Sequence, residues 1–202
     1  MRLAALLLVA LASQQEKSTA FERAVVREMS EIRVHPKAYA RHLRELRRFF
    51  EGALWRRPGR IALRTVEGLA ACDEAIAFLE SVKPVGPLLF DEGLARAARL
   101  HARDIGPRGS IEHVGSDGAG LSQRLERLGT WHGRIAENIS TGEEDPRQVV
   151  IQLLVDDGVP GRGHRRNLFN PDLLEAGAGS APHRDYGVVT VIDYADRFVP
   201  GR

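Results

Sequence analysis

Residues 163–171 read Gly163-His164-Arg165-Arg166-Asn167-Leu168-Phe169-Asn170-Pro171, and Gly177-Ala178-Gly179 follows shortly afterwards. A histidine and two arginines stand here between a glycine and an Asn-Pro turn, so a titratable group is presented at a structural corner. Taken alone, the stretch is equally consistent with a basic loop between a helix and a strand. Its interpretation depends on two segments that precede it.

The two upstream segments carry a second histidine and a carboxylate. His113 begins the glycine-rich sequence His-Val-Gly-Ser-Asp-Gly, and Glu137 interrupts an apolar, strand-like run from Ile135 to Ile139. Because side chains alternate along a strand, Glu137 is expected to face the same side as the two isoleucines. An unpaired buried charge is costly, so this carboxylate needs a partner. His164 and His113 have the right chemistry, although their spacing in the sequence does not enforce contact.

In this order and rough spacing, the three segments resemble the CAP superfamily. These secreted domains include cysteine-rich secretory proteins, insect antigen 5, plant pathogenesis-related proteins and many bacterial relatives. The resemblance covers residues 87–198 firmly and the N-terminal helix loosely. It implies an α+β fold, a three-layer α-β-α sandwich in which helices cover both faces of a small antiparallel sheet.

The resemblance also implies a site. In CAP domains two histidines and two acidic residues line a cleft, and several members hold a divalent metal there, often zinc. His113 is similar to the first histidine, Glu137 to the glutamate of the Glu-Asn segment, and His164 to the second histidine. The fourth position departs from the family pattern. Asp157 or Asp156 could occupy it, and the insertion 157–161 lengthens the approach to His164.

Two imidazoles with one or two carboxylates suit zinc or another first-row divalent ion. We therefore predict that His113, His164, Glu137 and Asp157 form a metal site. The alternative is a structural cluster in which the same groups are joined by hydrogen bonds and hold the sheet to the loops. No Ser-His-Asp or Cys-His arrangement stands out in the sequence.

Three functions remain open at this point. We favour an exported binding or interaction module, rather than an enzyme, with a His/Glu-lined cleft for an extracellular small molecule, lipid, peptide or protein. The second is a secreted metal-dependent hydrolase of peptide or cell-wall material, in which Glu137 is the catalytic group. The third is lipid or sterol binding, as in some family members, in an apolar groove between helices.

The N-terminus predicts export. Residues 1–12 combine a short positive start at Arg2, an apolar run from Leu3 to Leu11 and a small-x-small cleavage pattern that ends at Ala12. The apolar run is too short to span a bilayer, which needs about 20 residues. No cysteine follows it, which argues against a lipoprotein anchor. We predict a secreted or periplasmic protein that begins near Ser13, with no integral membrane segment.

Charge and cysteine content limit the other possibilities. The full chain has 29 basic and 27 acidic residues, and this balance gives no reason to propose nucleic acid or anionic lipid as the main partner. Arginine clusters such as Arg44, Arg47 and Arg48 are assigned to solvated helix faces. The single cysteine, Cys72, lies in a helical pattern and is predicted to be a buried thiol.

Hydrophobic periodicity divides the mature chain into an N-terminal helical segment, 13–86, that packs on a core domain, 87–202. His35-Pro36 is expected to interrupt the first helix, and residues 51–63 read as a loop. In the core domain, Asp91 and Asp145 are predicted N-caps. A hairpin is expected around residues 183–187. The core is predicted to include the following residues: Leu94, Ala98, Leu125, Val150, Leu153, Val189 and Val191.

Overall fold

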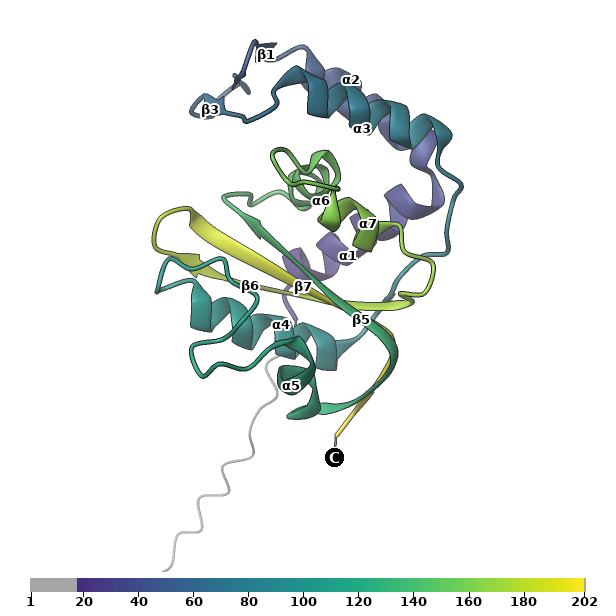
Figure 1. The fold of residues 1–202 in the computed structure, drawn as a ribbon, viewed down its shortest axis with the longest axis vertical. Helices are drawn as coiled ribbons and strands as arrows, with labels where there is room; N and C mark the ends of the chain where they lie inside the picture. Colours follow the sequence, from purple (N-terminus) through teal and green to yellow (C-terminus); the bar gives the residue numbers. More distant parts are fainter. Residues whose placement is uncertain (1–17, 202) are drawn as a thin grey trace, which may run out of the picture.

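A four-stranded sheet lies at the centre of the fold (Figure 1). In this computed structural model, which describes residues 18–201, the strand order is β4-β6-β7-β5. The strands are β4 (Leu89–Phe90), β5 (Gly129–Thr141), β6 (Glu175–His183) and β7 (Gly187–Pro200). β5, β7 and β6 pair antiparallel, as predicted, whereas the two-residue edge strand β4 runs parallel to β6. The predicted hairpin is confirmed as the β6–β7 turn.

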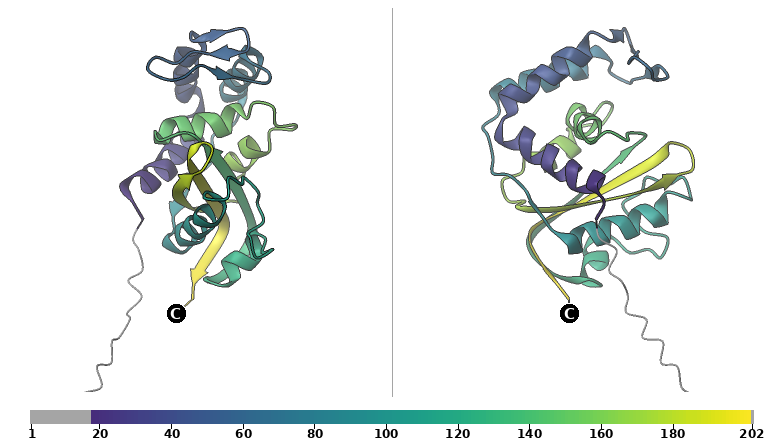
Figure 2. Two further views of the ribbon diagram at one scale, coloured as in Figure 1. Left: turned by 90° about the vertical axis from the view of Figure 1, so that its left-hand side faces the viewer. Right: turned by 180° about the vertical axis from the view of Figure 1, so that it is seen from behind.

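Helices cover both faces of this sheet (Figures 1 and 2). One face carries α4 (Glu92–Ile105) and α5 (Leu121–Glu126). The other carries α1 (Ala20–Val34), α6 (Pro146–Val155) and α7 (Gly163–Leu168), and beyond these lie α2 (Pro36–Arg47) and α3 (Leu69–Ser81). The predicted α+β, three-layer architecture is therefore confirmed. None of the helices within residues 18–201 is long and apolar enough to cross a membrane.

Local sequence signals set the helix boundaries. The side chains of Asp91 and Asp145 accept hydrogen bonds from the first turns of α4 and α6, as predicted, and Thr19 forms a capping box with Glu22 at the start of α1. His35 separates α1 from α2, because Pro36 cannot continue the hydrogen-bond ladder of α1. These signals determine where each helix begins, and tertiary packing determines which of its faces is buried.

The Gly177-Ala178-Gly179 sequence is explained by the contact between β6 and α4. A Cβ atom on Gly177 would lie 1.9 Å from the backbone nitrogen of Ala95, and one on Gly179 would lie 2.1 Å from that of Arg99. Neither distance is possible for a real side chain, so the two glycines allow the helix to lie directly on the strand. Their role here is packing.

The largest cluster of buried side chains joins segments that lie far apart in the sequence. One cluster of buried side chains unites residues of α1, α6, β6 and β7, among them Met29, Leu154, Ala178 and Ile192. All seven predicted core residues are buried, and so is Cys72. Burial of Cys72 raises the pKa of its thiol to about 11, so it is protonated at neutral pH.

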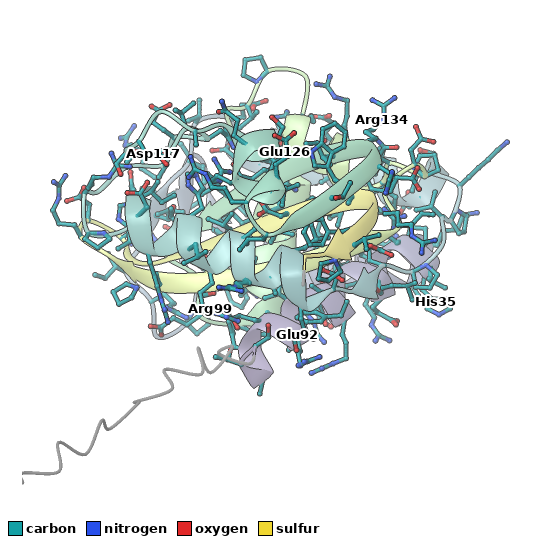
Figure 3. All side chains as sticks on the ribbon, turned by 90° about the horizontal axis from the view of Figure 1, so that it is seen from below. His35, Glu92, Arg99, Asp117, Glu126 and Arg134 are labelled. Carbon is teal, nitrogen blue, oxygen red and sulfur yellow. The ribbon has the colours of Figure 1, made fainter. Side chains whose placement is uncertain are left out.

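Two buried ion and hydrogen-bond networks tie the N-terminal helix to the rest of the chain. Arg33 is fully buried and donates to the carbonyl oxygens of Gly86, Leu168 and Leu173, among others. Arg99 of α4 pairs with Glu22 of α1 at 2.8 Å, and Figure 3 shows Arg99 and Glu92 beside the start of α1. Helix α1 is thus joined to both sides of the sheet.

One prediction was wrong in detail. Residues 51–63 are not simply a loop: they contribute to a second, three-stranded antiparallel sheet made of β1 (Phe50–Glu51), β2 (Leu54–Trp55) and β3 (Leu63–Arg64). Each strand has two residues, too few to produce a period that the sequence would reveal. We call residues 50–66 the β1–β3 arm; it extends from the ends of α2 and α3 (Figure 1).

Candidate functional site

Glu137 lies in the middle of the edge strand β5 and faces the layer that contains α4. Its register partner on β7 is Asp193, and its neighbours at alternating positions, Ile135 and Ile139, pack against residues of α4 and α5. The side chain of Glu137 is 3% exposed. The predicted orientation of this carboxylate, toward the side of the two isoleucines, agrees with this arrangement.

Three side chains surround the Glu137 carboxylate. His113 Nδ1 lies 2.8 Å from Oε1, and the Arg124 guanidinium of α5 donates to Oε2. His101 of α4 is nearly fully buried and approaches Oε1 at 3.9 Å, while its Nε2 donates to the carbonyl of Glu112. We call Glu137, His113, Arg124, His101 and Asp193 the Glu137 cluster.

Electrostatics in the Glu137 cluster favour an ion pair between Glu137 and His113. Burial opposes ionisation of Glu137, but the hydrogen bond from His113 and the charge of Arg124 outweigh it and hold the pKa of Glu137 below its usual range. The same hydrogen bond raises the pKa of His113. Burial lowers the pKa of His101, so this imidazole is held neutral.

Asp193 is the least expected member of the Glu137 cluster. It is fully buried, and within residues 18–201 neither of its carboxyl oxygens has a hydrogen-bond partner of normal geometry. Burial, and then the negative charge of Glu137 opposite it, raise the pKa of Asp193 well above the ordinary aspartate value. Folding therefore favours the protonated form of the Asp193 carboxyl, which lies across the β5–β7 pair from Glu137.

His164 belongs to a different pair. It lies in the first turn of α7, where its Nδ1 is 2.6 Å from Oδ1 of Asp156 and its backbone N–H donates to Oδ2. Asp156 caps α6 in the left-handed conformation, with φ of 55°, and this geometry turns its carboxylate toward α7. Because Nδ1 faces Asp156, Nε2 is the ring nitrogen left to bond a ligand, as an acceptor in the neutral ring or as a donor in the imidazolium.

The structure places Asp157 away from His164. Its carboxylate accepts hydrogen bonds from the backbone N–H groups of Val66 and Glu67, at 2.6 and 2.8 Å, and so fastens the β1–β3 arm to the end of α6. Of the two aspartates considered for the fourth position, Asp156 is the one that contacts a histidine. The insertion 157–161 lets the chain turn before α7, where Arg162 pairs with Glu67 and Glu74.

A cavity of about 340 Å³ lies between the β1–β3 arm, α2, α6 and β5. Most of its wall is apolar, and the polar groups on it include the His164–Asp156 pair and Glu143, which forms a buried ion pair with Arg57 at 2.7 Å. The apolar lining residues are mainly the following: Leu43, Leu46, Phe50, Trp55, Leu63, Ile111, Ile139, Ile151, Leu153, Val155 and Val159.

The predicted site residues are thus divided into two pairs, His113 with Glu137 and His164 with Asp156. The cavity reaches from the second pair toward the first, since its lining includes Ile111 and Ile139, each two residues from His113 or Glu137. Asn138 links the two regions, because its side-chain amide donates to the carbonyl of His164. Within residues 18–201 the His164 side chain forms no hydrogen bond or ion pair with either Glu137 or His113.

The contacts of Glu137 and His113 do not favour a divalent metal at this pair. A cation at Glu137 would have to compete with the guanidinium of Arg124, which already holds one carboxylate oxygen, and with His113, whose raised pKa favours the protonated, non-ligating form. In the part of the chain that the structure describes, no group of three or more His, Cys, Asp or Glu side chains is arranged to hold a metal ion.

Sequence reasoning missed Arg124 and Asp193. Asp193 could have been found by the argument applied to Glu137, because it interrupts the apolar strand Val188–Tyr194 at the position in phase with Val189 and Val191. Arg124 gave no such signal, since an arginine in a short amphipathic helix is ordinarily solvated. Only the packing of α5 on β5 brings its guanidinium to Glu137.

Comparison with known proteins identifies the family. The sequence model of the cysteine-rich secretory protein (CAP) family matches residues 45–194, which is well over half of the chain. The chain belongs to this family, and the resemblance that the sequence motifs indicated is confirmed. The matched range begins within α2, so it includes the β1–β3 arm and α3 as well as the central sheet.

Individual relatives are distant. The uncharacterized protein YkwD of Bacillus subtilis (strain 168) is 27% identical over 93 residues, which are 46% of this chain and 34% of that protein. The chain therefore spans about a third of the length of the curated relative that it matches.

Two solved structures are also similar. An outer surface protein from Borrelia burgdorferi has 23% identity and a TM-score of 0.48, with 56% of this chain and 80% of that one covered. An extracellular protein that contains an SCP domain, from Bacillus anthracis str. Ames, has 20% identity and a TM-score of 0.44, with 64% and 38% covered. Both are described by their names as surface or extracellular proteins. The signal peptide predicted for residues 1–12 lies outside the described residues.

Proposed function

We propose that this protein is an exported binding module of the CAP family that takes up a small, largely apolar molecule in the cavity beneath the β1–β3 arm. The observation that carries the proposal is the cavity itself. Its volume of about 340 Å³ falls in the range of small-molecule sites. Its wall is mainly apolar, with polar groups that include His164, Asp156 and Asp157 at one end. A ligand with an apolar body and one polar end, such as a medium-chain fatty acid, matches that lining.

The His164–Asp156 pair supplies the polar end of the site. Asp156 holds the imidazole through two hydrogen bonds, to Nδ1 and to the backbone N–H, so its orientation is fixed before a ligand arrives. His164 keeps 25% of its side chain exposed, whereas Asp156 is buried. Such preorganisation lowers the cost of ordering on binding, so one hydrogen bond here contributes to orientation and specificity.

The Glu137 cluster has a structural role in this proposal. Its central carboxylate is shielded by Arg124 and His113, and only His113 of the cluster is substantially exposed, at 56% of its side chain. These contacts do not favour the alternative of a metal-dependent hydrolase with Glu137 as the catalytic group. Metal analysis of the purified protein and of the His113→Ala/His164→Ala variant tests this directly. We expect no stoichiometric zinc in either, and zinc that is lost in the variant would reverse the conclusion.

Binding of a fluorescent medium-chain fatty acid tests the cavity. Leu46 lines it from α2, and Leu46→Trp should fill part of the space and weaken binding by tenfold or more. Leu100→Trp is the matched control, because Leu100 is half exposed on α4, on the other side of the sheet. The proposal fails if the wild type does not bind the probe, or if both variants bind it as the wild type does.

A further inference from the structure

The tip of the β1–β3 arm exposes apolar side chains to an unusual degree. Ile61 is 94% exposed, Val66 79% and Leu63 48%. Ile61 and Leu63 are two residues apart in an extended segment, so they point to the same side. The arm lies at the end of the molecule opposite α4 and α5 (Figures 1 and 2). Within residues 18–201 little covers the side chains of Ile61 and Val66, whereas Leu63 is about half covered.

The same segment concentrates positive charge. Residues 50–66 contain four arginines (Arg56, Arg57, Arg60 and Arg64) and one acidic residue, Glu51, which gives 4 − 1 = +3 in 17 residues, while the whole chain carries only +2. Arg56 pairs with Glu51 and Arg57 with Glu143. Within residues 18–201, Arg60 and Arg64 form no ion pair, and both are exposed on either side of Ile61 and Leu63.

From this juxtaposition we infer that the β1–β3 arm is a docking surface for an anionic lipid bilayer. Ile61, Leu63 and Val66 enter the boundary between headgroups and acyl chains, and the arginines bind lipid phosphates. Interfacial binding of this kind scales with buried apolar area and with attraction of basic side chains to the negative surface. The near-neutral charge of the whole chain does not oppose it, because screening confines each interaction to about 10 Å.

The arm is held in place before docking. Asp157 binds the backbone of Val66 and Glu67, the Thr65 hydroxyl donates to the carbonyl of Ala53, and Arg57 is pinned by Glu143. These contacts hold the arm in the conformation that exposes its apolar side chains. Arg60 and Arg64 also disfavour a second copy as the occupant, since apposed arms would bring like charges together.

The docking surface adjoins the cavity but does not depend on it. Leu63, Arg64 and Thr65 belong to the arm and also line the cavity, so docking would place the cavity beside the bilayer. Ile61 and Val66 do not line the cavity. Variants at these two positions therefore test docking while leaving the proposed ligand site intact.

The test is co-sedimentation of the mature protein with vesicles of phosphatidylcholine containing 30 mol% phosphatidylglycerol, compared with vesicles of phosphatidylcholine alone. The wild type should partition onto the anionic vesicles, and binding should weaken as salt rises. Ile61→Asp/Val66→Asp and Arg60→Glu/Arg64→Glu should each lower the partition coefficient by about tenfold or more. The matched control is Arg96→Glu/Leu100→Asp, two exposed α4 residues on the far side of the sheet, which should bind as the wild type does.

Three outcomes would overturn the inference. The first is a wild type that does not bind, or that binds both kinds of vesicle equally. The second is arm variants that bind as the control does. The third, from sedimentation equilibrium without lipid, is a dimer that Ile61→Asp/Val66→Asp dissociates, which would assign the surface to self-association. Fatty-acid binding by Ile61→Asp/Val66→Asp, whose two positions do not line the cavity, should stay at the wild-type level, so failure of docking and failure of the proposed function are distinguishable.

Discussion

The Glu137 cluster and the His164–Asp156 pair are both built from a histidine and a carboxylate, yet their surroundings differ. Glu137 is enclosed by Arg124, His113 and His101, and its negative charge is compensated by contacts within the protein. Asp156 uses its charge to orient His164, whose ring lines an apolar cavity. The same residue types thus stabilise the fold in one region and orient a cavity-lining imidazole in the other. The difference comes from Arg124, a cation that neighbours Glu137 but has no counterpart beside Asp156 among the contacts described above.

The largest expected effect is on stability, at Glu137. Glu137→Ala removes the partner of Arg124, a buried guanidinium whose side chain is 9% exposed. An uncompensated buried charge of this kind should lower the free energy of unfolding by about 3–5 kcal/mol. Chemical denaturation at pH 7 measures the change, with Glu126→Ala, an exposed residue of α5, as the control. A loss below about 1 kcal/mol for Glu137→Ala would show that the cluster does not hold α5 to the sheet.

The next largest effect is expected on ligand affinity, at the His164–Asp156 pair. Asp156→Asn keeps the left-handed cap, which asparagine also tolerates, but it presents an N–H group to one of the two donors on His164. We expect the affinity for the apolar probe to fall about tenfold, and the free energy of unfolding to fall by about 1–2 kcal/mol. Titration with the fluorescent fatty acid measures the affinity. An unchanged affinity would remove the His164–Asp156 pair from the proposed site.

Much of the fold could be predicted from the sequence because its signals are local. Asp91, Asp145 and the Pro36 break set helix boundaries within one turn of chain, and the apolar periodicity indicated the buried faces. The β1–β3 arm could not be predicted, since two-residue strands have no period and depend on pairing across turns. Helix α7 was not predicted either, because it lies within the stretch that the sequence suggested could be a basic loop.

The candidate site was predicted less completely than the fold. Its residue types were visible in the motifs, and the need of the buried Glu137 carboxylate for a partner pointed to His164 or His113 without deciding between them. The structure pairs it with His113. The choice between Asp156 and Asp157 depends on a single backbone conformation at the end of α6, which no side-chain pattern encodes. The ion pair between Arg124 and Glu137, which argues against a metal at this carboxylate, depends on how α5 packs, a long-range property.

A smaller effect is expected at Asp193, in the dependence of stability on pH. An acid whose pKa is raised by folding binds its proton more tightly in the folded state, so it lowers stability as pH rises above the ordinary aspartate pKa, about 3.9. Asp193→Asn removes this titration while it keeps the shape of the side chain. The stability of the variant relative to the wild type should therefore be greater at pH 7 than below about pH 4. An effect of the substitution that is the same at both pH values would show that folding does not raise the pKa of Asp193.

The smallest effect is expected at Asp157, the neighbour of Asp156. Asp157→Asn keeps an acceptor for only one of the two N–H groups, of Val66 or Glu67, and presents an N–H group to the other. Because both hydrogen bonds are exposed to water, the free energy of unfolding should still fall by less than about 1 kcal/mol. Asp157 also lines the cavity, but its carboxylate is hydrogen-bonded to Val66 and Glu67 rather than to His164, so affinity for the apolar probe should stay within about twofold of the wild type. The two adjacent asparagine variants, assayed side by side, therefore discriminate between the two aspartates. If Asp157→Asn weakens probe binding as strongly as Asp156→Asn, the β1–β3 arm must control access to the cavity, and the polar end of the site cannot be assigned to His164 and Asp156 alone.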